Sequence, residues 1–448
     1  EYLQTYYNHN WVSRVKIHRE VYMKKGLVLA GGGTRGAYQA GAVRAYRQYE
    51  KNDWDIVVGT SVGSLNAALI VQKDYEALDE LYQNLRSDQI IQGIVPTEID
   101  RDVLLNRTTE LKKEIVQYVK ERGVDITPFE QTVHAMYTPE KFFHSDVDFG
   151  CMVATHLNHS PVYITKKEMK EHGEDWLIAS ASCYPAFPIK TIDGKDYVDG
   201  GYYDNCAIDF ALKLGAEEVD VIDLNCEPNH PEFIEKSNIA YQFPQSDTGN
   251  FLQFDHEVVM RLYTRGYNDA CKMMHIYSGL KYTFEKTKLP ASFKGWYIAL
   301  ERFETGIYRT SHFVNSASVI TDMLKKQTHR HTLSDAQYFF SMLDNVMDLF
   351  DFDETIVYTL PEVKKRIHLA LQDAYAENYA YTPAVSIKDF IKSLDKLGRV
   401  KYFLHEDIFP DHVLLPDTVM HSVYPLEKAL ADFIYLCLGG KHGKNCKV

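Results

Sequence analysis

The stretch DIVVGTSVGSLNAAL, residues 55–69, places a serine between two glycines where one hydrophobic pattern gives way to another. The apolar run that ends at Gly59 predicts a buried strand, and the apolar residues after Ser61 recur at helical spacing. A strand that ends in Gly-x-Ser-x-Gly ahead of a helix is the nucleophile-elbow arrangement. The turn is sharp, so we expect a side chain at Gly59 or Gly63 to collide with neighbouring segments.

Ser61 of this elbow, flanked by Thr60 and Val62, also lies at a predicted helix N-terminus. Unpaired backbone N–H groups and the positive end of the helix dipole favour a developing negative charge there. Taken alone, the motif fits an incidental serine in a glycine-rich turn about as well as a catalytic one.

The composition narrows the class of protein. The chain has 448 residues, 45% of them hydrophobic and 25% charged, which is typical of a globular protein with about two domains. A net charge of -13 argues against nucleic acid as a partner, and the longest apolar runs are too short to span a bilayer. Seven cysteines, an odd number without a Cys-x-x-Cys pair, favour free thiols in a reducing, cytoplasmic compartment.

The N-terminal residues 1–22 show neither strand alternation nor a helical stripe, whereas the first predicted strand follows Met23 directly. The codons for residues 18–22 can be written to contain AGGGAGGT shortly before an ATG at Met23, as in a bacterial ribosome-binding site. We therefore expect residues 1–22 to be leader sequence outside the fold, the alternative being a genuine surface extension.

Strand and helix patterns alternate over the first half of the chain, which predicts a largely parallel sheet covered on both faces, a three-layer α/β/α fold. The expected strands are 26–30, 55–59, 151–157, 161–165, 197–201 and 218–224, and the expected helices are 37–49, 64–72, 175–181 and 209–215.

The domain organisation follows from the same patterns. Residues 23–245 are the expected catalytic domain, and residues 76–145 within it are mostly helical and polar, which indicates a lid or cap. Beyond residue 245 long helical stretches predict a mainly α-helical C-terminal region, residues 246–448, whose role stays open.

A second glycine-rich loop, AGGGTRG at residues 30–36, follows the first strand and can turn backbone N–H groups toward an anion. Its glycines also satisfy G-x-G-x-x-G, which makes a nucleotide-binding oxidoreductase an alternative. In that fold an acidic residue ends the second strand. Here Asp53 and Asp55 precede the strand, and the elbow occupies its end.

Three motifs together, GGGTRG, GTSVG and the Asp-Gly-Gly of residues 199–201, resemble those of the patatin-like phospholipases of bacterial type. The resemblance covers about residues 24–225 and includes SASCYPAFPI at residues 180–189. It implies that Ser61 is the nucleophile and Asp199 its base. It also implies that Gly200 and Gly201 complete the base motif and that the oxyanion hole lies in the glycine-rich loop, formed by Gly31, Gly32, Gly33, Thr34, Arg35 and Gly36, with Arg35 in the family's basic position.

The chain departs from the family at one point. An Asn-x-Pro often follows the Asp-Gly-Gly motif in that family, whereas Asn205 is followed here by Cys206 and Ala207. This difference concerns the rigidity of the loop more than the chemistry.

The implied activity is the hydrolysis of lipid acyl esters, with a phospholipid or another lipid as substrate, transient contact with a membrane surface, and neither metal nor cofactor. A carboxylate is a weak base toward a serine hydroxyl, so Asp199 has to act on Ser61 directly in a partly desolvated pocket. An acyl-serine ester then forms and is hydrolysed by water.

Other functions stay open from the residues alone. A Ser-Asp-His triad requires a late histidine such as His230, and a lipid carrier on the same fold requires no catalysis. Neither Cys226 with His230 nor the histidines of residues 329–331 form a complete metal-ligand set. The 31 tyrosines and 22 phenylalanines fit a core, an acyl-chain groove or lipid contact equally.

Overall fold

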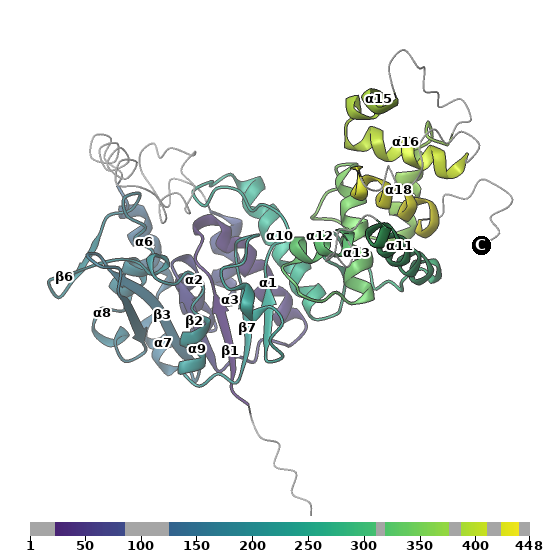
Figure 1. The fold of residues 1–448 in the computed structure, drawn as a ribbon. Coiled ribbons are helices and arrows are strands. Elements are labelled where there is room, and N and C mark those ends of the chain that lie inside the picture. Colours follow the sequence, from purple (N-terminus) through teal and green to yellow (C-terminus); the bar gives the residue numbers. More distant parts are fainter. Residues whose placement is uncertain (1–22, 86–124, 311–318, 376–386, 410–422, 439–448) are drawn as a thin grey trace, which may run out of the picture.

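The computed structural model describes residues 23–85, 125–310, 319–375, 387–409 and 423–438, and Figure 1 shows how these parts are arranged. The expected leader, residues 1–22, and most of the expected cap, residues 86–124, lie outside the described residues. A sheet flanked by helices forms the N-terminal half, and a group of helices forms the C-terminal half (Figure 1).

The central sheet has the strand order β5-β6-β3-β2-β1-β7-β8, with β4 also paired to β3. Helices flank this sheet, so the predicted three-layer α/β/α architecture is confirmed. Its strands are β1 (Lys25–Leu29), β2 (Ile56–Thr60), β3 (Asp148–Thr155), β4 (Pro161–Thr165), β5 (Lys190–Ile192), β6 (Lys195–Asp199), β7 (Glu218–Ile222) and β8 (Ile239–Gln242).

The expectation of a largely parallel sheet holds for only part of it. Strands β1, β2, β3, β7 and β8 run parallel to one another. Strands β4 and β6 are each antiparallel to β3, and β5 is antiparallel to β6. The physical reason is the length of the connections: residues 156–160 separate β3 from β4, and a parallel crossover needs a dozen residues or more. Strands β5 and β8 were not predicted.

Helices α1 and α2 each follow a strand of the sheet directly, as the alternation predicts. The helices of this half are α1 (Gly36–Gln48), α2 (Val62–Val71), α3 (Tyr75–Gln83), α6 (Thr127–Met136), α7 (Pro139–His144), α8 (Met169–Ser180), α9 (Ile208–Lys213) and α10 (His256–Met273).

The C-terminal region is mainly helical, as predicted, but it also contains a small three-stranded sheet that was not predicted, β9 (Ser278–Gly279), β10 (Thr283–Phe284) and β11 (Val357–Tyr358). Its described helices are α11 (Ala291–Thr310), α12 (Val319–Thr328), α13 (Asp335–Asp348), α14 (Leu360–Ala370), α15 (Ile387–Ser393), α16 (Lys396–Ile408) and α18 (Pro425–Cys437).

Two separate apolar cores divide the described chain later than the predicted boundary at residue 245. The first core continues to Cys271 and includes the buried face of α10, and the second begins at Tyr282. Helix α10 therefore belongs to the sheet half, because its apolar side chains are buried against that core. None of the helices in the described ranges is long and apolar enough to cross a membrane.

Candidate active site

Ser61 occupies a strained turn between β2 and α2, with φ 55° and ψ -128°. A Cβ at Gly59 would lie 2.2 Å from the carbonyl oxygen of Gly63, and one at Gly63 would lie 2.2 Å from that of Leu29. The predicted collisions at these two glycines are confirmed, and they explain why the turn tolerates no side chain two residues before or two residues after the serine.

Hydrogen bonds to the backbone hold Ser61 in this conformation. The N–H of Ser61 donates to Oγ of Ser180 at 2.9 Å, and that hydroxyl donates in turn to the carbonyl of Met152 at 2.7 Å. The hydroxyl of Ser64 donates to the carbonyl of Ser61 at 2.6 Å. Each such bond contributes about 1 kcal/mol, which offsets part of the roughly 1–3 kcal/mol cost of a strained backbone position.

The two edges of β3 explain how Ser61 meets Asp199. Strand β4 pairs with residues 150–154 of β3, β2 pairs with residues 148–152 and β6 with residues 153–155. Because β4 overlaps both of the others, it must occupy one edge of β3 while β2 and β6 share the opposite edge. Strand β2 therefore ends opposite Met152 at the point where Asp199 of β6 pairs with Val153. The two strands meet end to end, with Ser61 leaving one and Asp199 closing the other.

Asp199 is fully buried at this junction. Its N–H donates to the carbonyl of Ser182 at 2.9 Å, and its Oδ1 accepts the N–H of Gly201 at 2.7 Å. A Cβ at Gly200 would lie 2.2 Å from the carbonyl oxygen of Met152, so this glycine lets the chain cross β3 closely. Residues 180–182, part of the segment quoted for the family resemblance, thus hold the backbones of both predicted catalytic residues.

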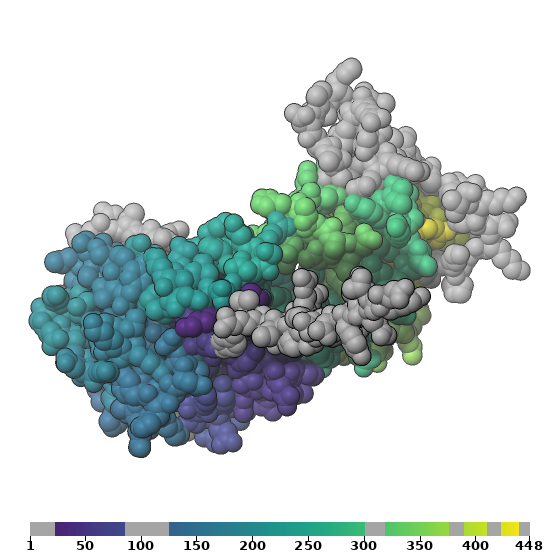
Figure 2. Space-filling model, turned by 90° about the horizontal axis from the view of Figure 1, so that it is seen from below, coloured from purple at the N-terminus to yellow at the C-terminus, as the bar shows by residue number. Residues whose placement is uncertain are grey.

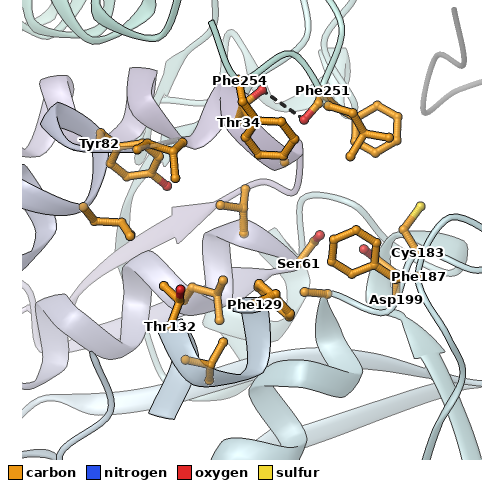
Figure 3. A pocket seen from close by; sticks show the side chains of 18 of the residues that line it. Thr34, Ser61, Tyr82, Phe129, Thr132, Cys183, Phe187, Asp199, Phe251 and Phe254 are labelled. Carbon is orange, nitrogen blue, oxygen red and sulfur yellow. Dashed lines mark hydrogen bonds between the residues drawn. The ribbon is translucent and has the colours of Figure 1, made fainter. Parts of the chain in front are cut away.

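Both residues line one pocket, in which about 80 Å³ is open to the centre of a water-sized sphere (Figure 3). The side chains of Ser61 and Asp199 lie beside each other there, and apolar groups surround them (Figure 3). The apolar wall consists of Val62, Leu65, Leu81, Tyr82, Leu85, Phe129, Val133, Met136, Ala181, Cys183, Phe187, Phe251, Leu252 and Phe254.

The glycine loop, residues 31–36, lies next to the elbow because β1 and β2 are parallel neighbours and both end at this edge of the sheet. Among the residues that the structure describes, the N–H groups of Gly32 and Gly33 donate to no other atom. The other N–H groups of the loop donate to carbonyl oxygens, Gly31 to Asn205 at 3.0 Å, Thr34 to Phe251 at 2.8 Å, Arg35 to Gly32 at 3.2 Å, and Gly36 to Gly33 and Thr34.

The residues predicted to form the oxyanion hole therefore differ in whether they have a donor available for a ligand. Gly32 and Gly33 keep donors for a ligand, whereas the buried guanidinium of Arg35 supports the loop. Its Nε donates to the carbonyl of Gly32 at 3.2 Å and its Nη1 to Oδ1 of Asn225 at 3.1 Å. Asn205, which follows the Asp-Gly-Gly motif, accepts from Gly31 N–H and donates to Gly31 O at 3.1 Å.

His230 lies away from this pocket, whose lining residues include no histidine in the part of the chain that the structure describes. Its Nε2 lies 3.0 Å from Oδ1 of Asp204, and its Nδ1 lies 3.1 Å from Oε1 of Glu232. The hydrogen bond to Asp204, with the charge of both carboxylates, raises the pKa of His230 to about 9 against the opposing effect of burial. The geometry thus gives His230 two acidic partners and no contact with the predicted nucleophile.

The structure also shows where the remaining candidate residues lie. Asp55 precedes β2, and its carboxylate accepts the N–H of Lys25 at 2.8 Å, at the end of the sheet opposite the glycine loop. No group of three or more potential metal ligands occurs among the described residues. Burial raises the pKa of the Cys151 thiol to about 12, so this group stays neutral beneath the site.

Sequence reasoning missed the pocket residues 251–254, which it assigned to a long C-terminal helix. The carbonyl of Phe251 accepts both the N–H and the hydroxyl of Thr34, at 2.8 and 3.0 Å, and Phe251, Leu252 and Phe254 line the pocket. Asp255 caps α10 by accepting the N–H groups of residues 257 and 258. Aspartate is a preferred N-cap residue, so FLQFD could have been recognised as a loop followed by a helix start.

Comparison with known proteins bears on the same part of the chain. Residues 27–212 match the family model of the patatin-like phospholipases. The chain is 27% identical over 208 residues to lysophospholipase NTE1 of Mycosarcoma maydis, which is 45% of this chain and 10% of that protein. It is 25% identical over 211 residues to the uncharacterized protein YjjU of Escherichia coli K12, 44% of this chain and 50% of YjjU. The matched segments thus span half or less of these relatives.

Two solved structures were also found. VipD from Legionella pneumophila aligns over 95% of this chain and 94% of its own at 13% identity and a TM-score of 0.38. The type III effector protein ExoU aligns over 93% and 94% of the two chains at 13% identity and a TM-score of 0.30. At such scores neither alignment carries a conclusion about this chain.

Proposed function

We propose that this chain hydrolyses acyl esters of lipids through a Ser61–Asp199 dyad, since residues 27–212 match the family model of the patatin-like phospholipases. The observation that carries the proposal is the end-to-end meeting of β2 and β6 on one edge of β3, which places both side chains in one apolar pocket.

The first half of the proposed reaction forms an ester on the serine. Asp199 takes the proton of the Ser61 hydroxyl while Oγ attacks the ester carbonyl of the lipid, and the N–H groups of Gly32 and Gly33 stabilise the negative oxygen of the tetrahedral intermediate. When the intermediate collapses, the carbon–oxygen bond to the alcohol half breaks, and Asp199 returns the proton to the departing alkoxide. The acyl group remains on Ser61.

The second half restores the enzyme. Water gives a proton to Asp199 and attacks the acyl-serine carbonyl; the second intermediate collapses to a fatty acid, and Ser61 takes the proton back. The sequence of steps needs no metal and no cofactor. The fully buried position of Asp199 and the apolar wall keep bulk water away from the carboxylate.

The apolar wall favours the acyl chain as the part of the lipid that enters the pocket, which leaves the polar half outside. A phospholipid is the substrate that the family match supports, and neutral lipids carry the same scissile bond. The described part of the expected cap, α3 and α6, supplies Leu81, Tyr82, Phe129 and Val133 to this wall, so we propose that the cap helps to enclose the acyl chain.

The test is to incubate the protein with phospholipids, lysophospholipids and triacylglycerols and to quantify released fatty acids by mass spectrometry. We expect release by the wild type, none by Ser61→Ala, and full release by Ser160→Ala, which removes a hydroxyl in the β3–β4 turn outside the pocket. Lipid that binds without any product would indicate a carrier. Release that persists in Ser61→Ala would overturn the assignment.

A further inference from the structure

The segment of residues 245–254 connects β8 to α10 and lies against the glycine loop on one side. Phe251 accepts two hydrogen bonds from Thr34, as described above. The hydroxyl of Thr248 accepts from Nη1 of Arg35 at 3.4 Å and donates to the carbonyl of Leu224 at 3.0 Å. Since Arg35 also donates to the carbonyl of Gly32, this segment supports the loop directly at Thr34 and, through Arg35, at Gly32.

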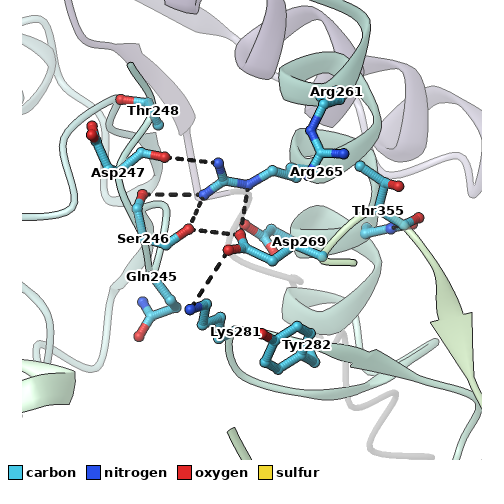
Figure 4. A network of polar contacts seen from close by, with 12 residues as sticks. Gln245, Ser246, Asp247, Thr248, Arg261, Arg265, Asp269, Lys281, Tyr282 and Thr355 are labelled. Atoms are coloured by element: carbon cyan, nitrogen blue, oxygen red, sulfur yellow. Dashed lines mark hydrogen bonds and ion pairs between the residues drawn. The ribbon is translucent and has the colours of Figure 1, made fainter. Parts of the chain in front are cut away.

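On its other side the segment is fixed by an ion pair that reaches the C-terminal region (Figure 4). Arg265 of α10 donates to the carbonyls of Ser246 and Asp247 at 3.1 and 3.0 Å and to the hydroxyl of Ser246 at 2.7 Å. Its Nε lies 3.1 Å from Oε2 of Glu354, and the hydroxyl of Ser246 donates to the same oxygen at 2.6 Å. The side chains of Arg265 and Glu354 are only 11% and 19% exposed, so solvent screens this pair poorly.

Glu354 belongs to the loop between α13 and β11, which α10 holds at three successive residues. Nη1 of Arg261 lies 3.3 Å from Oδ2 of Asp353, and Arg265 forms the ion pair with Glu354. The side-chain amide of Asn268 donates to the carbonyl of Thr355 at 3.0 Å. Positions 261, 265 and 268 follow the i, i+4, i+7 spacing of one helix face. This face of α10 thus contacts each residue of the loop 353–355 through a polar side chain.

The opposite face of α10 is packed tightly on α1, the helix that begins at the end of the glycine loop. A Cβ at Gly266 would lie 1.8 Å from the carbonyl oxygen of Tyr38, and one at Gly41 would lie 1.8 Å from that of Tyr263. The two backbones are therefore in direct contact, and α10 has little freedom to shift relative to the loop.

We propose that Glu354, from the C-terminal region, is a positioning residue for the oxyanion hole. It fixes Ser246 and Arg265, and these fix residues 246–248. Thr248 and Phe251 then fix Arg35 and Thr34, so that the backbone of Gly32 and Gly33 keeps the position that the proposed oxyanion hole requires. The inference rests on the proposed function and gives the C-terminal region a part in it. Its consequence is that a change more than 300 residues along the chain from the glycine loop alters the turnover number rather than substrate binding.

The experiment compares Glu354→Ala with Glu427→Ala in the full chain. Glu427 makes a pair of the same chemistry with Arg399, at 3.0 Å and with 13% and 19% exposure, but within the C-terminal region. We expect Glu354→Ala to lower kcat on a phospholipid about tenfold with KM within about twofold, since small displacements of catalytic groups cost rate rather than binding. Glu427→Ala should leave both within about twofold.

A second readout does not depend on catalysis. The amide proton of Thr34, held by Phe251, should exchange with solvent faster in Glu354→Ala than in the wild type or Glu427→Ala. Glu354→Gln, whose amide oxygen can still accept from Ser246 and Arg265, should show a smaller effect in both measurements and replaces the alanine variant if that one does not fold. Equal kcat and equal Thr34 exchange in the two glutamate variants would overturn the proposal. Absence of Ser61-dependent turnover in the wild type would instead overturn the proposed function, and the exchange measurement would still decide the role of Glu354.

Discussion

At the scale of single residues, the geometry of the site depends on two unusual backbone conformations. Ser61 is strained but held by Ser180 and Ser64, and Gly33 has φ +58°. Gly33 is also enclosed, since a Cβ there would lie 2.2 Å from the carbonyl oxygen of Phe251. That same oxygen holds Thr34, so a side chain at position 33 would push away the group that orders the loop.

Gly33→Ala should therefore lower kcat more than tenfold with little change in KM, because it displaces the oxyanion donors and leaves the acyl pocket in place. The matched control is Gly194→Ala in the β5–β6 turn, which has a similar φ of +72° but nothing within 4 Å of the added carbon. The positive φ should cost each variant roughly 1–2 kcal/mol of unfolding free energy. Gly33→Ala should lose more than Gly194→Ala, because its added carbon also collides with Phe251. Steady-state kinetics and thermal unfolding of the two variants provide the comparison, and equal kcat values would contradict the expectation.

His230 gives a pH-dependent prediction at the same scale. Its folded pKa of about 9 lies above the unfolded value of roughly 6.5, so its pairing with Asp204 and Glu232 stabilises the fold fully below about pH 6.5 and is lost as the pH rises through about 9. His230→Gln should lower the melting temperature most near pH 6 and least near pH 10. A difference that grew with pH would show that the histidine is neutral in the folded protein.

At the scale of elements, the site depends on which strands share an edge of β3 and on which helices face the pocket. Strand β3 carries β2 and β6 on one edge, which brings the nucleophile and the base together. Helix α6 presents Phe129, Thr132 and Val133 to the pocket, opposite residues 251–254 (Figure 3). These two parts of the pocket wall therefore come from segments that lie far apart in the sequence, both of them after the nucleophile.

Thr132→Trp should fill part of the pocket and exclude long acyl chains. We expect kcat/KM for a long-chain p-nitrophenyl ester to fall about tenfold relative to that for the butyrate ester, since a bulky side chain removes the volume that the chain occupies. Ala135→Trp on the exposed face of the same helix controls for the added tryptophan. An unchanged ratio in Thr132→Trp would show that the acyl chain binds elsewhere.

At the scale of the whole molecule, helix α10 connects the two apolar cores that the described residues form. One face of α10 is buried with the sheet half, and its charged face meets residues 353–355 of the C-terminal half. The segment just before α10 supplies pocket residues, so the two halves are linked where the glycine loop is held. This arrangement gives the C-terminal half a structural connection to the site.

The sequence predicted the parts of the molecule that local patterns determine. Tight turns require glycine, so the sequence shows the turn at Ser61 through Gly59 and Gly63, and the turn at Asp199 through the two glycines that follow it. Strands β1, β2 and β7 are recognisable as short apolar runs. The positions of the predicted catalytic residues in one pocket agree with this interpretation, while their roles stay proposals.

Long-range contacts account for what the sequence did not predict. The antiparallel half of the sheet depends on which edge of β3 each strand joins, and the place of Phe251 depends on a contact with Thr34, 217 residues earlier. The role of Arg35 was also not predictable from local sequence. Its position in the motif suggested the oxyanion hole, but distant partners such as Asn225 determine that its guanidinium supports the loop.

The most direct test of the dyad is the reaction of the protein with a fluorophosphonate probe, followed by mass-spectrometric mapping of the modified residue. The account predicts modification at Ser61 in the wild type, labelling at least a hundredfold slower in Asp199→Asn, whose amide keeps the shape but cannot take the proton, and unchanged labelling in His230→Gln. Modification at a different serine, or labelling that Asp199→Asn keeps and His230→Gln loses, would contradict it.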